Sequence, residues 1–127
     1  MKQNPADIVK EYWNRMQSND FPYAAEMFSD QVVIDWPQSH ERIPGKANFI
    51  AINTEYPANG RWEFTLEEIV CDGNKVVTVV LITDSVVQAK AITFSTIENG
   101  LIIQQTEYWP EDYPAPENRK HLVEPLK

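Results

Sequence analysis

The sequence predicts an α+β fold, with helices dominating the first half of the chain and antiparallel strands the second. Apolar residues recur at helical spacing in the first sixteen residues, and again from residue 46 to 56. From residue 61 onward the pattern changes to alternating segments rich in β-branched and aromatic residues. The turn signal Asp72-Gly73-Asn74 separates two of these segments as a hairpin would. Helices followed by a run of strands are typical of α+β domains.

The helical half begins at Asn4-Pro5, because Asn is a good N-cap and Pro is favoured at the first helical position. Ile8, Tyr12 and Met16 recur at every fourth residue and predict a buried stripe. Tyr12 is either an ordinary core residue or one that points its hydroxyl into a pocket. A second short helix is expected over residues 21–28. A third is expected over residues 46–56, ending before Pro57.

Strands are expected over residues 31–36, 62–70, 76–83, 88–97 and 100–109. The segment 76–83 is nearly all aliphatic, which implies cover on both of its faces. Three helices can cover only one face of the sheet. We therefore predict a homodimer in which the sheet face of one subunit packs against that of its partner.

Length, charge and cysteine content limit the possible functions. A chain of 127 residues predicts a single domain over residues 1–127. The net charge of −8 argues against partners that carry phosphates, namely nucleic acids and anionic membranes. No apolar leader or run of about 18 apolar residues is present. Together with the single Cys71, which favours a reducing compartment, this predicts a cytoplasmic protein.

The most informative segment is the strand expected over residues 100–109. In a strand, Gln105, Glu107 and Trp109 share one face. An ordinary core strand would not place an ionisable Glu between an aliphatic triplet and two aromatic residues. We therefore predict that Glu107 and Trp109 line a ligand cavity.

Other polar groups indicate less. His40 and His121 have no metal-ligand spacing with each other or with Cys71, so neither a metal nor a cofactor is expected. His40 lies in a polar loop over residues 37–45 and is either a proton relay at the cavity mouth or a solvated surface residue. Arg42 is expected to pair with Glu41, or else to close over an anionic ligand.

Residues 110–127 form a Pro-rich C-terminal arm, which holds four of the nine prolines and is not expected to form regular structure. It is either a disordered tail or an arm packed along the body or along a partner subunit. Tyr113, Leu122, Val123 and Leu126 would be unusual in a solvated tail, so we favour the packed arm.

Two segments carry a resemblance to a known family. Residues 36–45 read WPQSHERIPG, which is similar to a W-P-Q-S-G-E-R-I-x-G loop found in SnoaL-like proteins, with His40 where that pattern usually has Gly. Residues 107–119, EYWPEDYPAPENR, are similar to the ending of the same group. The chain thus resembles the nuclear transport factor 2-like superfamily. This resemblance implies a cone-shaped, curved antiparallel sheet wrapped around three N-terminal helices, with a hydrophobic cavity inside.

Ketosteroid isomerase is a better-understood member of that superfamily, and its catalytic positions can be compared with this chain. Tyr12 matches the oxyanion-hole tyrosine of the enzyme. Trp36 stands where the enzyme has its general-base Asp, and Ile92 where it has a protonated Asp. Abstraction of a proton next to a carbonyl needs a base and an acid together. The resemblance therefore does not imply ketosteroid isomerase activity.

In SnoaL-like polyketide cyclases an acidic residue in the cavity acts as a general acid/base. The resemblance assigns this role to Glu107, with Tyr12 as hydrogen-bond donor and His40 as relay, in cyclase, isomerase or dehydratase chemistry on a small apolar or aromatic molecule. The predicted ligand-binding residues are Met16, Trp36, Trp62, Phe94, Gln105 and Trp109. Two alternatives stay open: a non-catalytic ligand-binding or carrier domain, and a dimeric scaffold with a vestigial cavity.

Overall fold

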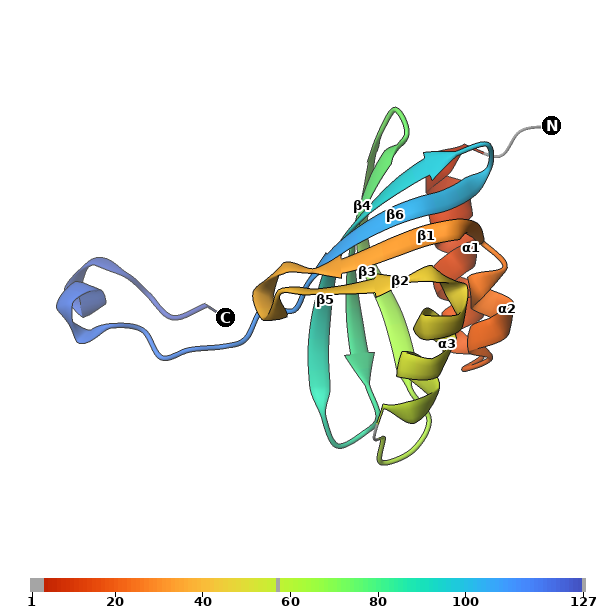
Figure 1. Cartoon of the computed structure of the whole chain (residues 1–127). Helices are drawn as coiled ribbons and strands as arrows, with labels where there is room; N and C mark the ends of the chain where they lie inside the picture. Colours follow the sequence, from red (N-terminus) through yellow and green to blue (C-terminus); the bar gives the residue numbers. More distant parts are fainter. Residues whose placement is uncertain (1–3, 57, 127) are drawn as a thin grey trace.

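The computed structural model describes residues 4–56 and 58–126 (Figure 1). The residue predicted to stop the third helix, Pro57, lies outside the described residues. The fold is the predicted α+β class. Its elements are α1 (Pro5–Gln17), α2 (Phe21–Ala25), β1 (Phe28–Trp36), the 3-10 helix η1 (Pro37–Ser39), β2 (Glu41–Pro44), α3 (Gly45–Glu55), β3 (Glu63–Asp72), β4 (Lys75–Thr83), β5 (Gln88–Glu98), β6 (Leu101–Tyr108) and the 3-10 helix η2 (Glu117–Leu122).

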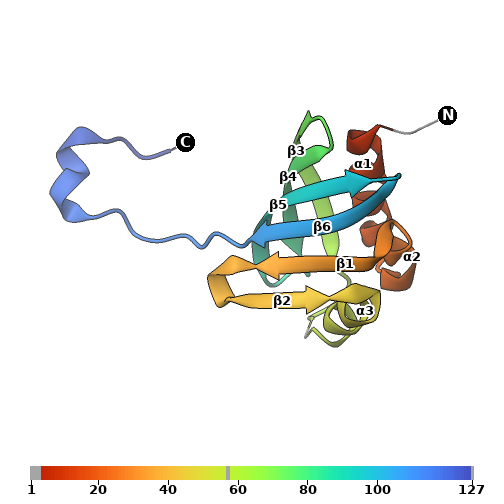
Figure 2. The ribbon, with the colours of Figure 1, turned by 45° about the horizontal axis from the view of Figure 1, so that its top comes forward.

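The six strands form one curved sheet in the order β2-β1-β6-β5-β4-β3. The three α-helices lie on one side of this sheet, which we call the inner face (Figures 1 and 2). Two features differ from the prediction. The loop expected over residues 37–45 contains the short strand β2, and β1 pairs with β6 in parallel rather than antiparallel fashion. β1 and β6 lie side by side but are separated by most of the chain, a distance in sequence that allows the crossover a parallel pair requires.

Irregular strand pairing accompanies the curvature of the sheet. The register shifts between Leu66 and Glu68 where β3 pairs with β4, and between Thr96 and Ile97 where β5 pairs with β6. A β-bulge of this kind adds a residue to one strand, bends it and increases its twist. The bends turn the sheet around the helices, and space for a cavity remains between them.

Helix α1 supplies the centre of the core, as its sequence predicts. The Asn4 side chain caps the helix by accepting a hydrogen bond from the Asp7 backbone N–H at 2.9 Å. Ile8, Tyr12 and Met16 are all buried. The Tyr12 ring lies 5.1 Å from that of Phe28 on β1, centroid to centroid. The helix is therefore held against the inner face by apolar packing along its predicted stripe.

The sheet has a second face, the outer face, that none of the helices in the described residues covers (Figures 1 and 2). Along β4, Val76 and Val80 are buried on the inner face, whereas Leu81 is exposed on the outer face. Six outer-face side chains from neighbouring strands, which we call the outer patch, are apolar and partly or fully exposed: Val70, Val77, Val79, Ile92, Phe94 and Tyr108. Within one chain, β4 thus lacks the cover on both faces that its sequence predicts.

The arm does not pack along the body of its own chain. After Trp109 it runs away from the sheet and lies clear of all other elements (Figures 1 and 2). It contains the 3-10 helix η2, so the prediction that this segment forms no regular structure is wrong over Glu117–Leu122. Leu122 on η2 is 75% exposed, and Tyr113 and Leu126 are also exposed. Of the two packed arrangements considered above, an arm along its own body is therefore wrong.

Candidate functional site

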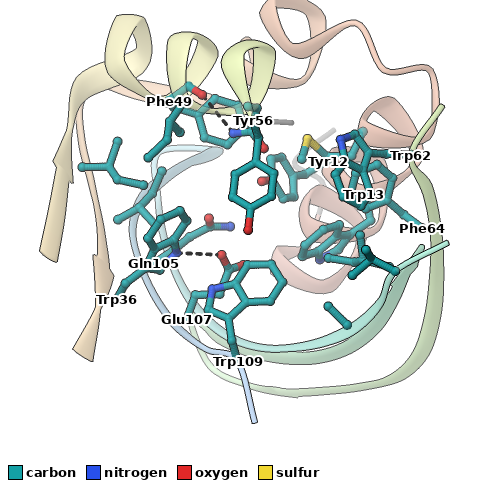
Figure 3. Close-up of a pocket in the computed structure, with 18 residues that line it drawn as sticks. Tyr12, Trp13, Trp36, Phe49, Tyr56, Trp62, Phe64, Gln105, Glu107 and Trp109 are labelled. Carbon is teal, nitrogen blue, oxygen red and sulfur yellow. Dashed lines mark hydrogen bonds between the residues drawn. The ribbon is translucent and has the colours of Figure 1, made fainter. Parts of the chain in front are cut away.

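A cavity of about 240 Å³ lies between the inner face of the sheet and helices α1 and α3 (Figure 3). Most of its wall is aromatic or aliphatic. Its polar side chains are few: Tyr12 from α1, Asn53 from α3, and Gln105 and Glu107 from β6. The aromatic residues of the wall are Tyr12, Trp13, Trp36, Phe49, Tyr56, Trp62, Phe64 and Trp109.

Glu107 occupies the wall of this cavity with only 7% of its surface exposed. Its carboxyl group accepts two hydrogen bonds, one at each oxygen. The indole Nε1 of Trp36 donates to Oε1 at 3.0 Å, and the Thr93 hydroxyl donates to Oε2 at 2.7 Å. Thr93 is directly opposite Glu107 on β5, which places its hydroxyl on the same face of the sheet. Two donors from different strands therefore fix the carboxyl group in the cavity.

The surroundings of Glu107 shift its proton affinity. Burial raises the pKa of this carboxyl above its ordinary value, and the hydrogen bonds from Thr93 and Trp36 oppose the rise only in part. A carboxyl group with a raised pKa exchanges protons at a pH closer to neutrality than an exposed one does. The geometry and the electrostatics at Glu107 thus meet two requirements of a general acid/base.

Tyr12 lies at the closed end of the cavity and is buried against Trp13, Phe28 and Phe49. Burial raises the pKa of Tyr12 well above its ordinary value. The nearby Glu107 charge raises it further, and hydrogen bonding with Gln105 opposes the shift. The phenol therefore keeps its proton at neutral pH and remains a hydrogen-bond donor.

Gln105 links this end of the cavity to β5, because its Nε2 donates to the Ser95 hydroxyl at 3.2 Å. Within the described residues, every buried side-chain nitrogen or oxygen has a hydrogen-bond partner. The buried polar side chains of the inner face therefore have their hydrogen bonds satisfied within the protein.

Trp36 and Trp109 form one edge of the cavity, with their rings at 87° and their centroids 6.2 Å apart. Gln38 fixes the position of Trp109, since its amide both donates to the Trp109 carbonyl and accepts from the Trp109 N–H. The Gln38 side chain thus makes the two backbone hydrogen bonds that a neighbouring strand would otherwise make just after β6. Trp36 is fixed by its hydrogen bond to Glu107 and Trp109 by Gln38, so both residues of this edge are held in place.

The opposite edge is formed by Tyr56 and Trp62, whose ring centroids are 6.0 Å apart. Asn19 holds the Trp62 backbone in place: it donates to the Trp62 carbonyl at 2.7 Å and accepts from the Trp62 N–H at 2.8 Å. Tyr56 is 58% exposed and therefore lies at the mouth. Asn53 also lines the cavity, and its Nδ2 donates to the Phe49 carbonyl at 2.9 Å.

Seven of the nine residues predicted for the site line this same cavity: Tyr12, Met16, Trp36, Trp62, Gln105, Glu107 and Trp109. This fixes their position, while their roles remain predictions. Phe94 was placed wrongly. It lies on the outer face, is 45% exposed and packs against Tyr108 with ring centroids 6.1 Å apart. Ile92 is likewise on the outer face, opposite Tyr108, and not where the ketosteroid isomerase comparison placed it.

His40 does not line the cavity. It is exposed between η1 and β2 and adopts a left-handed backbone conformation, with φ at 59°. The relay role predicted for it has no geometric support. The ion pair predicted between Arg42 and Glu41 is also wrong. Arg42 pairs with Asp35 across the β1–β2 ladder, with Nε and Oδ1 2.6 Å apart.

Sequence reasoning missed several residues of the site, above all Thr93, Asn53 and Tyr56. The signal for Thr93 was its position among the small residues of β5, at 89, 91, 93 and 95. These line the inner face and leave room for the cavity. Asn53 and Tyr56 lie at the end of α3, and only the packing of that helix against β1 directs them toward the cavity.

The described residues contain no group of three or more His, Cys, Asp or Glu side chains suited to holding a metal ion. In the same part of the chain, no helix is long and apolar enough to span a membrane. The polar side chains that line the cavity are those of Tyr12, Asn53, Gln105 and Glu107.

Comparison with known proteins gives a consistent family. The family model of the SnoaL-like domain matches residues 9–105, which include most of α1 and most of the sheet. No curated protein matches the chain. Among solved structures, a protein from Kribbella flavida, provisionally described as a ketosteroid isomerase, has 28% sequence identity and a TM-score of 0.88. The match covers 97% of this chain and 90% of that one.

Two further structures are similar. A nuclear transport factor 2-like protein of unknown function from Burkholderia xenovorans has 25% identity and a TM-score of 0.79, with 97% of this chain and 95% of that chain covered. A protein from Shewanella denitrificans, provisionally described as a SnoaL-like polyketide cyclase, has 11% identity and a TM-score of 0.70, with 84% and 90% covered. The last of these shows a shared fold only.

Proposed function

Because the chain belongs to the SnoaL-like domain family, we propose that it binds a small, largely apolar molecule and catalyses a cofactor-independent proton transfer on it. The reaction would be of the isomerase, cyclase or dehydratase type. Glu107 would act as general acid/base and Tyr12 as hydrogen-bond donor. The observation that carries the proposal is a single buried carboxyl group, with a raised pKa, in the wall of an otherwise mostly apolar cavity.

The proposed chemistry is proton transfer at a carbon next to a carbonyl group. The Glu107 carboxylate removes the proton, and the electron pair of the broken C–H bond moves to the carbonyl oxygen to give an enolate. The Tyr12 hydroxyl, protonated because its pKa is raised, would stabilise that oxygen by a hydrogen bond. Glu107 then returns the proton to the same carbon or to another one. The aromatic wall excludes water and so strengthens both interactions.

The proposal is tested without knowledge of the natural substrate. The probe is 2-tetralone, a bicyclic ketone that has exchangeable protons beside its carbonyl and is small enough for the cavity. Exchange of these protons in D₂O is followed by NMR. We expect the protein to accelerate the exchange and Glu107→Gln to reduce that acceleration at least about 100-fold, the range typical of general base catalysis.

Glu98→Gln is the matched control, since it makes the same change at an exposed position on the neighbouring strand. This variant should exchange the probe at the wild-type rate. Equal rates for the wild type and Glu107→Gln would contradict the catalytic role.

A non-catalytic carrier is the second candidate, and one observation favours it. Both oxygens of Glu107 already accept hydrogen bonds, from Trp36 and Thr93, as they would in a carboxyl group that only orders the cavity. Titration with 2-naphthol, followed by tryptophan fluorescence, tests whether the cavity binds a small aromatic molecule at all. A carrier binds this probe and exchanges no protons of 2-tetralone, while a scaffold with a vestigial cavity binds neither molecule.

We also propose a homodimer formed through the outer face of the sheet. The outer patch supports this arrangement, because exposed or partly exposed apolar residues gather there on four neighbouring strands. Light scattering at micromolar concentration tests it, and a monomeric mass would contradict it. A cytoplasmic location stays a prediction that rests on the single Cys71.

A further inference from the structure

The arm is built to reach away from its own subunit. Gln38 holds its root at Trp109 through both backbone groups of that residue. Pro110, Pro114 and Pro116 then follow within seven residues. Proline-rich segments are stiff and extended, so residues 110–116 span about 20 Å at the rise of polyproline II. The arm accordingly places η2 well clear of the body (Figures 1 and 2).

The end of the arm carries apolar side chains that its own subunit leaves uncovered. Leu122, Val123 and Leu126 are all exposed, and Tyr113 is exposed midway along the arm. The η2 helix is six residues long, and a 3-10 helix of this length is not stable in water without packing. These residues therefore need another surface.

The arm is also shared with solved relatives. Residues 110–127 are about one seventh of the chain, so a match over 97% of it must include most of them. Both the Kribbella and the Burkholderia structures meet this condition. The match to the Shewanella structure covers 84%, a share that the body alone can supply. The arm is thus a structural element of this chain and of two relatives.

The outer patch offers the apolar surface that the arm lacks. On this face Val70, Val77 and Phe94 lie opposite one another on β3, β4 and β5, and Ile92 lies opposite Tyr108. Tyr108 is the last residue of β6, so the patch begins beside the root of the arm. The stiff proline segment points η2 away from this patch on its own subunit. A second copy can present the same patch to η2 without any reversal of the arm.

We propose that the arm crosses to a second copy of this chain and packs Leu122, Val123 and Leu126 against the outer patch of that copy. The arrangement is reciprocal, so two copies exchange arms around a two-fold axis. This inference deepens the homodimer proposed above and rests on it. It adds that the arm, and not the sheet alone, holds the two subunits together.

The test compares the dimer dissociation constant of full-length variants by analytical ultracentrifugation. Leu122→Asp/Leu126→Asp places charge on the apolar side of the arm. We expect its Kd to rise about 100-fold or more, since two leucines lose their burial. Ala115→Asp/Asn118→Asp adds the same two charges to the arm without removing a large apolar side chain, and it should stay within about 3-fold of wild type. Circular dichroism checks that every variant is folded.

Mixing shows whether the contact lies between two chains. Phe94→Asp damages the patch and should also raise the Kd. A heterodimer of Phe94→Asp with Leu122→Asp/Leu126→Asp keeps one intact arm on one intact patch, so the mixture should form dimers where each variant alone is monomeric.

Three results would overturn the inference. In the first, the mixture stays monomeric. In the second, Leu122→Asp/Leu126→Asp dimerises like the wild type while Phe94→Asp does not, which leaves a dimer held by the sheet alone. In the third, the wild type is monomeric at about 100 μM, a concentration at which even a weak dimer would be detected; this result also removes the homodimer itself.

Discussion

Each face of the sheet carries side chains of a kind that its exposure to solvent would not predict. The inner face buries polar side chains, which form the pairs Trp13–Thr78, Gln105–Ser95 and Thr93–Glu107. The outer face exposes apolar ones, among them Phe94 and Tyr108. Buried polar groups and exposed apolar groups are the informative exceptions to the usual distribution. They support the proposals that the inner face serves a small molecule and the outer face another protein chain.

The largest expected difference is in the free energy of unfolding, between a charge placed on the inner face of β4 and one placed on its outer face. Val80 is fully buried on the inner face, and its neighbour Leu81 is exposed on the outer face opposite Lys90. Val80→Asp should lower the free energy of unfolding by more than about 4 kcal/mol, because a lone charge is buried. Leu81→Asp should cost less than about 1 kcal/mol. Urea denaturation of the two variants measures this difference. Similar losses of unfolding free energy would contradict the assignment of Val80 to a buried face and Leu81 to an exposed one.

A smaller effect is expected for hydroxyl groups on the two faces of β5. Thr93→Val keeps the side-chain shape and removes the donor to Glu107, at a cost of about 1.5–3 kcal/mol. The pKa of Glu107 should rise further, because its charged form loses a hydrogen bond. Thr96→Val, on the outer face, loses only an acceptor for the Lys75 amino group and should cost less than about 1 kcal/mol. Equal losses in chemical denaturation would indicate that the Thr93 contact is weak.

The titration of Glu107 makes stability depend on pH. The folded pKa is raised by burial, so the folded state keeps this proton at a pH where the unfolded chain has released it. This contribution to stability is neutral below the unfolded pKa and turns increasingly unfavourable as the pH rises through the folded pKa. The melting temperature of Glu107→Gln, measured relative to wild type, should therefore increase over that interval. A difference independent of pH would show that Glu107 titrates normally.

The smallest effect belongs to the Asp35–Arg42 pair at the edge of the sheet. Asp35→Asn should cost less than about 1 kcal/mol, because both partners are partly solvated. The hydrogen bond from Arg42 lowers the pKa of Asp35. The contribution of the pair to the free energy of unfolding is therefore present above the unfolded pKa of Asp35 and is lost as the pH falls through the folded pKa. A double-mutant cycle with Arg42→Gln at pH 7 and pH 3 measures it. A coupling energy that stays the same at pH 3 would contradict this assignment.

Much of this protein follows from its sequence by local rules. The Asn4 cap and the stripe of Ile8, Tyr12 and Met16 specify α1, since capping and helical spacing act within a few residues. Alternation on a strand places Gln105 and Glu107 on one face, and both face the cavity. The α+β class and the cavity-lining position of Glu107 were therefore predictable from sequence.

The partner of Glu107 was decided by tertiary structure. Glu98 pairs with Leu101 beside the β5–β6 turn, and regular pairing from there would place Ile92 opposite Glu107. The bulge adds one residue to β6 between Ile102 and Gln104, which shifts the register by one residue and brings Glu107 opposite Thr93 on the inner face. Ile92 and Phe94 face outward through the unbroken alternation of β5. Strand alternation has a period of two and does not reveal where an extra residue is inserted. The bulge forms where the curved sheet closes around its helices, and that curvature involves the whole fold.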